Sequence, residues 1–219
     1  MENPGRGGME RDPFSEHSSR YEAWFSDHPN AYQAEVRAVR ELMGPAGRSV
    51  EIGVGTGRFA VPLGVTWGVD PALPMLRTAR EKGVEAVLGV GEALPFPDSA
   101  FDLALMVTTV CFLDDHQEAF LEAHRILRPG GRLIVGFVDR SSPLGTLYLH
   151  RKEQSVFYRT ARFYTVAEIK ASLTQVGFGA FEYRQTLFGP LPETLPSEPV
   201  KKGHGEGSFV VVGAHVPMH

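Results

Sequence analysis

Three glycines separated by single residues are the first feature of this sequence that could do chemistry. They are Gly53, Gly55 and Gly57, within the run 49–60. Glycine lets the backbone turn with a positive φ angle and lets a ligand lie directly against the main chain. A short apolar strand precedes the glycines, and a helix whose first turn offers unpaired N–H groups can begin after them. This arrangement predicts a site for a nucleoside-type cofactor.

An acidic residue follows the second apolar stretch of the chain. That stretch is 65–69, and Asp70 stands directly after it. A carboxylate at the tip of a second parallel strand, beside a glycine turn, can accept hydrogen bonds from both hydroxyls of a ribose. A glycine turn by itself is weak evidence, because a tight turn without a ligand uses the same residues. The combination of two strands, spaced glycines, a helix start and a terminal acid favours a nucleoside cofactor.

The glycine spacing leaves two kinds of cofactor open. The dinucleotide fingerprint G-x-G-x-x-G/A fails when it starts at Gly53, because its last position falls on Arg58. It fits when it starts at Gly55 and ends at Ala60, but Asp70 then follows sooner than the roughly 20 residues expected for a dinucleotide fold. The motif alone therefore keeps an NAD(P)-dependent oxidoreductase as an alternative.

Composition limits the class of protein. The chain has 219 residues, a net charge of −4 and 42% hydrophobic residues, which is typical of one soluble globular domain. An acidic balance argues against a nucleic-acid surface, which usually needs a basic stripe. No apolar run approaches the roughly 18 residues of a spanning helix, and the first residues are too polar for a signal peptide. A single cysteine, Cys111, fits a reducing compartment. We expect a cytoplasmic protein without nucleic-acid or membrane partners.

Hydrophobic periodicity divides the chain into alternating strands and helices. Expected helices are a short pair around 14–25, then 31–43, 71–83, 116–127 and 165–177, the last opened by the capping box of Thr165 and Glu168. Expected strands are 50–52, 65–69, 84–88, 101–107, 132–138, 181–187 and 208–216.

The order of these elements predicts the fold class. Alternating strands and helices imply a parallel sheet with helices on both faces. The last two strands follow each other without a helix, so the final strand should run antiparallel. We therefore expect an α/β fold with a doubly wound, Rossmann-like sheet of seven strands, mostly parallel with an antiparallel last strand.

The domain organisation is expected to be simple. Residues 1–12 show no periodicity and should form a disordered tail, whereas 13–219 should form a single domain. Within it, 13–45 should form an N-terminal helical cap. The connections 139–163 and 188–207 are longer than ordinary loops, and long loops at a crevice tend to be functional. We expect both on the substrate side.

Five segments in the expected order resemble those of class I S-adenosylmethionine (SAM) methyltransferases. The resemblance extends from Arg37 to Val216, and a further segment before it, 20–25, is typical of small-molecule members of the methyltransferase type 11 kind. The segments are 51–57 (motif I, E-x-G-x-G-x-G), 91–102 (similar to DAEALPFPDxSFD), 127–133 (LRPGGRL), 163–178 (FYT…GF) and 20–25 (similar to RYDxWF).

This resemblance implies SAM as the cofactor and a small molecule as the methyl acceptor. It also assigns residues by position to the parts of the cofactor. Gly53, Gly55 and Gly57 would lie against the methionine part with Glu51 behind them and Tyr21 closing over them, Asp70 would hold the ribose, Gly91 and Glu92 would flank the adenine, and Val107 and Thr108 would line the floor.

One position departs from the family pattern. The family usually has Asp where this chain has Val90, and that carboxylate accepts from the adenine amino group. A buried amine without an acceptor costs about 1–3 kcal/mol. A backbone carbonyl or water would have to substitute, or SAM affinity would be reduced. This departure motivates a second alternative, a non-catalytic protein that binds SAM or S-adenosylhomocysteine (SAH).

Methyl transfer from a sulfonium is an in-line displacement, so the protein mainly has to hold the acceptor about 3 Å from the methyl in a dry pocket. A base is needed only if the acceptor must lose a proton. Asp139, just past the fifth strand, and His204 are candidates from position alone, and each is weighed against a surface or structural role. No H-E-x-x-H motif and no repeated Cys/His spacing suggests a metal site.

Some acceptors can be argued against. No Pro-Pro-Tyr or Pro-Pro-Phe follows the fourth strand, which argues against methylation of amino groups on nucleic-acid bases. No Pro-Cys pair offers a nucleophile for methylation of a cytosine carbon. One cysteine cannot build the site of several thiols expected for arsenic methylation. A small metabolite remains, and five aromatic residues could line its pocket or simply fill the core: Tyr148, Phe157, Tyr158, Phe163 and Tyr164. The acceptor atom and the oligomeric state stay open.

Overall fold

The computed structural model describes residues 13–45 and 47–218, so the tail expected at 1–12 lies outside the described residues. Three helices come first, strands then alternate with helices up to the third strand, and a loop leads from the third strand to the fourth. These elements are α1 (Pro13–Glu16), α2 (Ser18–Asp27), α3 (Pro29–Met43), β1 (Ser49–Ile52), α4 (Ala60–Leu63), β2 (Trp67–Asp70), α5 (Leu73–Glu81), β3 (Glu85–Leu88) and β4 (Phe101–Val107).

The second half of the chain continues the alternation and ends in strands. A short 3-10 helix, η1 (Val110–Phe112), follows β4. The remaining elements are α6 (His116–Ile126), β5 (Leu127–Val138), α7 (Pro143–His150), η2 (Lys152–Gln154), α8 (Val166–Gln175), β6 (Gly179–Thr186), η3 (Leu191–Glu193), β7 (Lys201–Lys202) and β8 (Phe209–His215). The predicted capping box opens α8, with Thr165 and Glu168 each bonding the other's backbone.

One mixed sheet runs through the molecule in the order β3-β2-β1-β4-β5-β8-β6-β7. The pairs from β3 to β5 are parallel, and β8 is antiparallel to both of its neighbours. The predicted doubly wound, mostly parallel sheet with an antiparallel last strand is therefore confirmed.

The predicted count of seven strands is wrong, because the sheet has eight. The additional strand, β7, pairs Lys201 and Lys202 with Gln185 and Arg184 at the edge of the sheet, inside the expected loop 188–207. Two residues are too few to give a periodic pattern. β5 also starts earlier than expected, and its register against β4 shifts between Phe101 and Leu103.

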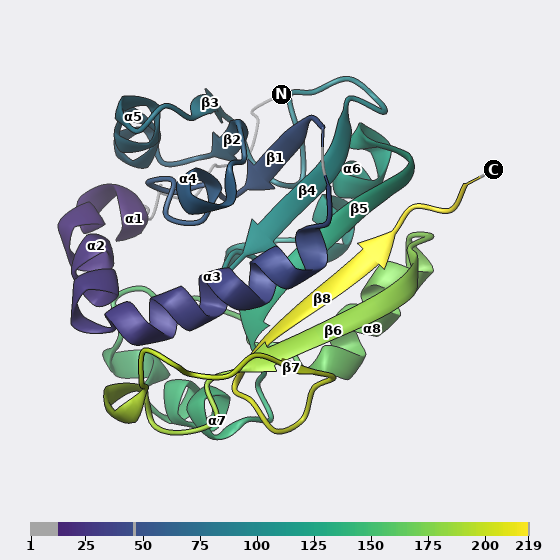
Figure 1. Ribbon diagram of the computed structural model, residues 1–219. Helices are drawn as coiled ribbons and strands as arrows, with labels where there is room; N and C mark the ends of the chain where they lie inside the picture. The colour runs from purple at the N-terminus through teal and green to yellow at the C-terminus, as the bar shows by residue number, and fades with distance from the viewer. Residues whose placement is uncertain (1–12, 46, 219) are drawn as a thin grey trace, which may run out of the picture.

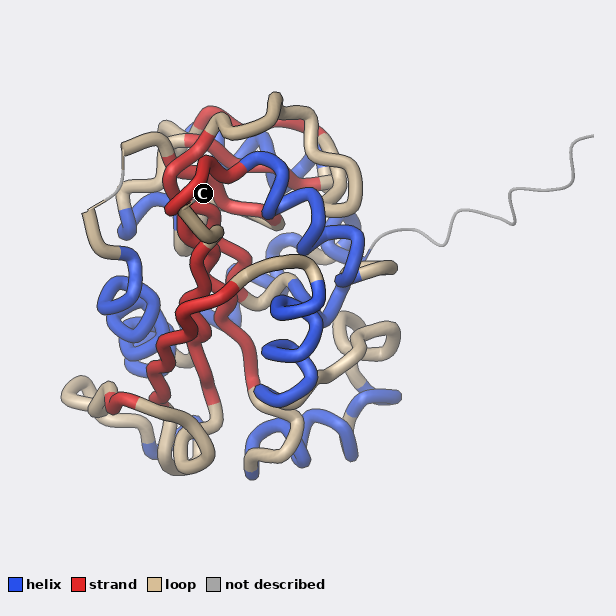
Figure 2. Tube along the Cα trace, turned by 90° about the vertical axis from the view of Figure 1, so that its right-hand side faces the viewer, coloured by secondary structure: helices blue, strands red, loops and turns tan. Residues whose placement is uncertain are grey.

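Helices cover both faces of the sheet, as the edge-on view in Figure 2 shows. Alternate side chains of β4 point to opposite faces: Leu103 and Leu105 pack in the cluster that contains α3, and Ala104 and Met106 pack in the cluster that contains α6 and α8. In Figure 1, α3 crosses the front of the sheet, while α2 and α7 lie beyond the arrowheads of the parallel strands. The carboxyl ends of the parallel strands line the candidate site.

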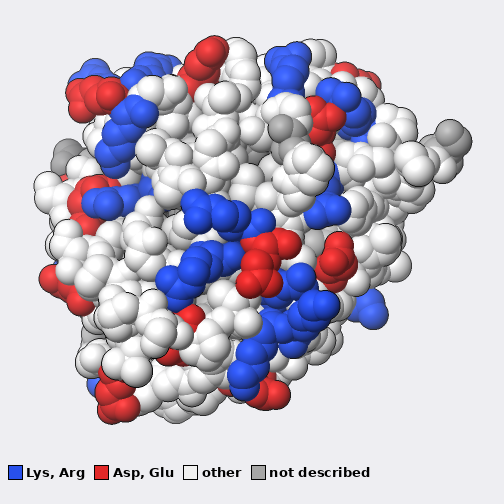
Figure 3. All heavy atoms as spheres, viewed as in Figure 1, with Lys and Arg blue, Asp and Glu red and all other residues white. Residues whose placement is uncertain are grey.

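The face that carries α3 has charges of both signs. Figure 3 shows basic side chains gathered near its middle, with acidic side chains among them. One ion pair joins Arg184 on β6 to Glu41 on α3, with 2.7 Å between Nε and Oε2.

Within the described residues, every helix falls short of the length and apolar content that crossing a bilayer requires.

Candidate active site

A cavity of about 1100 Å³ lies at the carboxyl ends of the parallel strands. Its lining includes the turn after β1, the end of β2, α1 and α2, and the segment 155–160. Pockets for one small molecule typically measure roughly 300–1,000 Å³. The cavity therefore has room for a cofactor and a second small molecule.

The glycine turn forms one wall of this cavity. All three of its glycines have positive φ angles, 75° at Gly53, 50° at Gly55 and 80° at Gly57. The N–H groups of Gly53 and Val54 donate to the carbonyl of Val69, at 2.8 and 3.0 Å, and tie the turn to β2. A Cβ atom at Gly53 would overlap the side chain of Thr109. Only glycine therefore fits there.

Asp70 joins the turn to the segment that leads into α5. One carboxylate oxygen accepts from the N–H of Gly55 at 2.8 Å, and the other accepts from the N–H of Ala72 at 2.8 Å. The residue is 9% exposed and lines the cavity. Each oxygen has further lone pairs, so the carboxylate can hold the turn and also accept from a ribose hydroxyl. Its role in holding the turn was not predicted.

Glu51 lies behind the glycine turn and outside the cavity lining. It is 1% exposed, and its Oε2 atom has no hydrogen-bond partner among the described residues. Burial raises the pKa of this carboxyl well above its usual range; a hydrogen bond with the backbone of Ala60 opposes the shift, and the nearby charge of Asp70 adds to it. A neutral carboxyl is therefore favoured beside the turn, where its O–H can donate.

The segment expected at the adenine also lines the cavity. A Cβ at Gly91 would lie 3.0 Å from the side chain of Leu113, so the backbone packs closely there. The Glu92 carboxylate accepts from the N–H groups of Asp114 and Asp115, at 2.9 and 3.2 Å. Val90 is 43% exposed and lines the same wall. Glu92 thus anchors the loop before α6.

Thr108 and Tyr21 complete the surroundings of the turn. Thr108 has a φ angle of 53°, which is rare for a β-branched residue, and its N–H donates to the carbonyl of Gly136 at 2.7 Å. The Tyr21 ring lies above the turn, since a Cβ at Gly55 would meet its hydroxyl oxygen at 3.5 Å. Burial is the largest cause that raises the pKa of Tyr21.

The structure separates the predicted residues into three groups. Those that line the cavity are Tyr21, Gly53, Gly55, Asp70, Gly91, Glu92 and Thr108. Those that lie outside its lining and support it are Glu51, Gly57 and Val107, the last in the core at 2% exposure. Asp139 and His204 do not line it: the Asp139 carboxylate accepts from the backbone and hydroxyl of Ser141, and exposed His204 packs on Tyr183. Neither residue is therefore assigned to the site.

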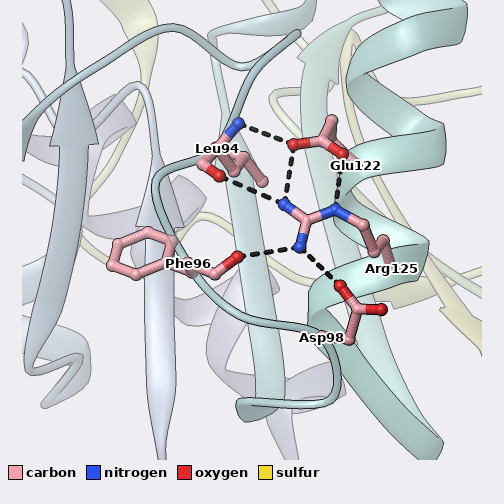
Figure 4. Close-up of polar contacts among 5 residues, drawn as sticks. All are labelled: Leu94, Phe96, Asp98, Glu122 and Arg125. Atoms are coloured by element: carbon pink, nitrogen blue, oxygen red, sulfur yellow. Dashed lines mark hydrogen bonds and ion pairs between the residues drawn. The ribbon is translucent and has the colours of Figure 1, made fainter.

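Arg125 on α6 holds the loop that carries the predicted adenine residues (Figure 4). Its guanidinium donates to the carbonyls of Leu94 and Phe96, at 3.1 and 2.8 Å, and pairs with Asp98 at 2.8 Å. It also pairs with Glu122 at 2.6 Å, and this carboxylate accepts from the N–H of Leu94. These bonds raise the pKa of Arg125 above its usual range. A charged clamp therefore fixes the loop.

We expect Arg125→Met to lower the free energy of unfolding by about 2 kcal/mol, because charge-assisted bonds to two carbonyls and two carboxylates are lost. SAH affinity should fall as well, since the loop leads from Gly91. Urea unfolding and calorimetry check both effects. Arg128→Met is the matched control, because Arg128 makes an exposed ion pair with Asp102 and should cost no more than about 1 kcal/mol. Equal losses in the two variants would contradict the clamp.

Among the cavity-lining residues that the sequence did not predict, Glu35 carries an ionisable group in an apolar setting. It lies in the middle of α3, is 3% exposed and lines the cavity. Burial raises the pKa of its carboxyl to about 8. The signal was present, because Glu35 is spaced by four residues from both Ala31 and Val39, which are buried on the same helix. An acid on the apolar stripe of a helix indicates a special environment.

Glu35 should make stability depend on pH. Its pKa is about 8 in the folded protein and roughly 4.3 when unfolded, so only the folded state keeps the proton between these values. The contribution of Glu35 to the free energy of unfolding should therefore be largest below the unfolded pKa and fall with rising pH up to about 8, by at most about 1.4 kcal/mol per pH unit. Glu51 adds to the same slope. Glu35→Gln should make the slope shallower in urea unfolding between about pH 5 and 8, whereas Glu41→Gln, on the same helix, should leave it unchanged. A Glu35→Gln slope equal to that of the wild type would contradict this assignment.

The chain is similar to known proteins over most of its length. The sequence profile of the family described as "Methyltransferase domain" matches residues 50–135. The chain is 49% identical to a SAM-dependent methyltransferase of Thermotoga maritima, described as a possible histamine N-methyltransferase. The two structures superpose with a TM-score of 0.91, and the match covers 93% of this chain and 97% of that chain.

Curated relatives agree with this match. The chain is 32% identical to the demethylmenaquinone methyltransferase of Thermus thermophilus, over 69% of this chain and 67% of the relative. It is 37% identical to an uncharacterized protein of Methanocaldococcus jannaschii, over 92% and 97%. It spans 62% of the length of three uncharacterized mycobacterial relatives. These matches favour a methyltransferase over the oxidoreductase that the glycine spacing left open.

Proposed function

Because the chain belongs to the SAM-dependent methyltransferases, we propose that it methylates a small molecule bound in the same cavity as the cofactor. When bound, SAM supplies an electrophilic methyl group on a sulfonium. The observation that carries the proposal is the cavity itself, which extends from the glycine turn to aromatic side chains of α7 and 155–164. One continuous cavity can thus hold the cofactor and the acceptor together.

The residues at the glycine end have the chemistry that SAM requires. Gly53 and Gly55 line the cavity without side chains and can lie against the methionine part, and Asp70 can accept from the ribose hydroxyls while it holds the turn. The neutral carboxyl favoured at Glu51 supports the turn from behind. Gly91 and Glu92 provide the wall for the adenine, with Val90 in contact with the same space.

The acceptor end supports positioning as the main contribution of the protein. A methyl acceptor with a free lone pair needs no base before the displacement, and enclosure in a dry pocket aligns it with the methyl carbon. The described lining holds aromatic rings of Phe112, Tyr148, Tyr158 and Phe163 that can exclude water.

A small-molecule acceptor has support from relatives of known name. One is a demethylmenaquinone methyltransferase, and another, from Geobacter sulfurreducens, is a malonyl-[acyl-carrier protein] O-methyltransferase. The mixed charges on the α3 face are unlike a basic nucleic-acid surface (Figure 3). We extend the proposal to a cytoplasmic enzyme without a nucleic-acid or membrane partner, consistent with the single cysteine.

Titration with SAH and, separately, with NADH tests the cofactor, using calorimetry on the purified chain. SAH should bind with a Kd in the micromolar range or tighter, and NADH should give no heat of binding. Incubation with methyl-labelled SAM and a library of small metabolites then tests transfer. Binding of NADH without SAH would contradict the proposal, and tight SAH binding with no labelled product from a broad library would favour a non-catalytic binder.

A further inference from the structure

Glu35 is an unusual residue for the middle of a buried helix. It is 3% exposed, yet within the described residues its carboxyl makes no hydrogen bond and no ion pair. Burying an ionisable group without a partner is costly, and such groups are paired or neutral in most proteins. Because Glu35 lines the cavity, its missing partner can come from a ligand. Buried titratable groups of this kind are concentrated at functional sites.

Aromatic rings line the cavity together with Glu35. Tyr148 and Tyr158 stack with their centroids 4.8 Å apart, and Phe163 lies 5.6 Å from Tyr158. The charge of Glu35 contributes to raising the pKa of both tyrosines, after burial. Trp24 lines the same space. Carboxylate and rings thus share one end of the cavity.

Glu35 and the glycine turn belong to different elements of the cavity wall. Glu51, Asp70 and Tyr21 influence one another electrostatically across the glycine turn. The charge of Glu35 acts on Tyr148 and Tyr158, and both Glu35 and Glu51 act on Tyr32. The cavity has room for two small molecules, so a cofactor at the turn leaves space for a second molecule at Glu35.

The charged groups around Glu35 indicate which kind of second molecule can bind there. The two arginines of the lining, Arg20 and Arg159, are exposed, and neither forms an ion pair with Glu35. A buried carboxylate without a basic partner attracts a cation and repels an anion. Aromatic faces attract the same cations, most strongly when water is excluded.

We propose that Glu35 binds a protonated amine of the methyl acceptor, with the rings of Tyr148 and Tyr158 beside it. The inference rests on the proposed function and names its substrate class: small molecules that carry a basic amine. The ionised carboxylate pairs with the ammonium, so a Glu35 that holds a proton in the free protein releases it when the amine binds. The other titratable groups around it are Tyr32, Tyr148, Tyr158 and Cys111, and burial raises the pKa of each, so they stay neutral near pH 7.

The test uses the full chain saturated with SAH and a broad panel of small primary, secondary and tertiary amines. Each amine is paired with the alcohol and the carboxylate of the same skeleton, for example 2-phenylethylamine with 2-phenylethanol and phenylacetate. We expect several amines, and not their partners, to raise the Tm. Calorimetry of these amines in buffers of different ionisation enthalpy should reveal release of a proton near pH 7. Glu35→Gln should weaken amine binding at least tenfold and abolish proton release.

The controls separate this inference from the proposed function. Glu35→Gln should bind SAH like the wild type, which also shows that the variant is folded, and Glu41→Gln should keep amine affinity. If the wild type fails to bind SAH, the proposed function fails. If SAH binds but no amine in the panel raises the Tm, or if Glu35→Gln binds the amines within twofold of the wild type, the role of Glu35 is wrong.

Discussion

Replacing Gly53 with alanine is expected to lower SAH affinity at least 100-fold. Gly53 has a φ angle of 75°, and a Cβ atom would overlap the Thr109 side chain, whose Cβ would itself be 2.9 Å away. The turn must therefore move, and the backbone that faces the cofactor moves with it. Calorimetric titration with SAH measures the loss, and urea unfolding measures the accompanying destabilisation.

Gly64→Ala is the matched control for this substitution. Gly64 has a φ angle of 72°, but a Cβ there would meet nothing within 4 Å. It should carry only the cost of the left-handed backbone, about 1–2 kcal/mol of stability, and leave SAH affinity unchanged. Thr109→Ala in the Gly53→Ala background should restore part of the affinity, because it removes the overlapping atoms beyond Cβ. If Gly53→Ala and Gly64→Ala bind SAH equally well, the close backbone is not needed.

Asp70→Ala should reduce SAH affinity by a factor similar to that expected for Gly53→Ala, for two reasons. The variant removes the expected acceptor for the ribose, and it leaves the N–H groups of Gly55 and Ala72 without their acceptors. Each unsatisfied buried N–H costs about 1–3 kcal/mol. Stability and affinity should therefore fall together.

Asp70→Asn distinguishes the two contributions. Its amide keeps one carbonyl oxygen, so one of the two backbone bonds survives and the loss of stability should be smaller than in Asp70→Ala. Glu81→Ala, at the exposed end of α5, serves as the control and should change neither quantity. Wild-type SAH affinity in Asp70→Ala would remove this residue from the site.

Local patterns were sufficient to predict most of the fold. Apolar runs such as 101–107 and the capping box at Thr165 depend on neighbours in sequence, and both are confirmed. β7 was missed because its two residues are defined by pairing with β6, which no local pattern encodes. The start of β5 at Leu127 was also missed. Leu127 is in the strand because it pairs with Phe101, whereas the local sequence Pro129 to Gly131 indicates a turn.

The site was harder to predict than the fold, because its contacts join distant segments. The glycine turn and Asp70 were found from their spacing, but the bond between Asp70 and Gly55 depends on how β1 and β2 align. Asp139 was chosen for its place after β5, whereas its carboxylate caps its own turn at Ser141. Glu35 was overlooked because its helix looked like a simple core helix.

The central claim is that the cofactor lies across the ends of β1 and β2. A crystal structure of the complex with SAH tests it most directly. We predict the ribose hydroxyls on the Asp70 carboxylate, the homocysteine part against Gly53 and Gly55, and the space beside Glu35 left for a second molecule. SAH bound elsewhere, or side chains filling the space above the glycine turn, would contradict the account.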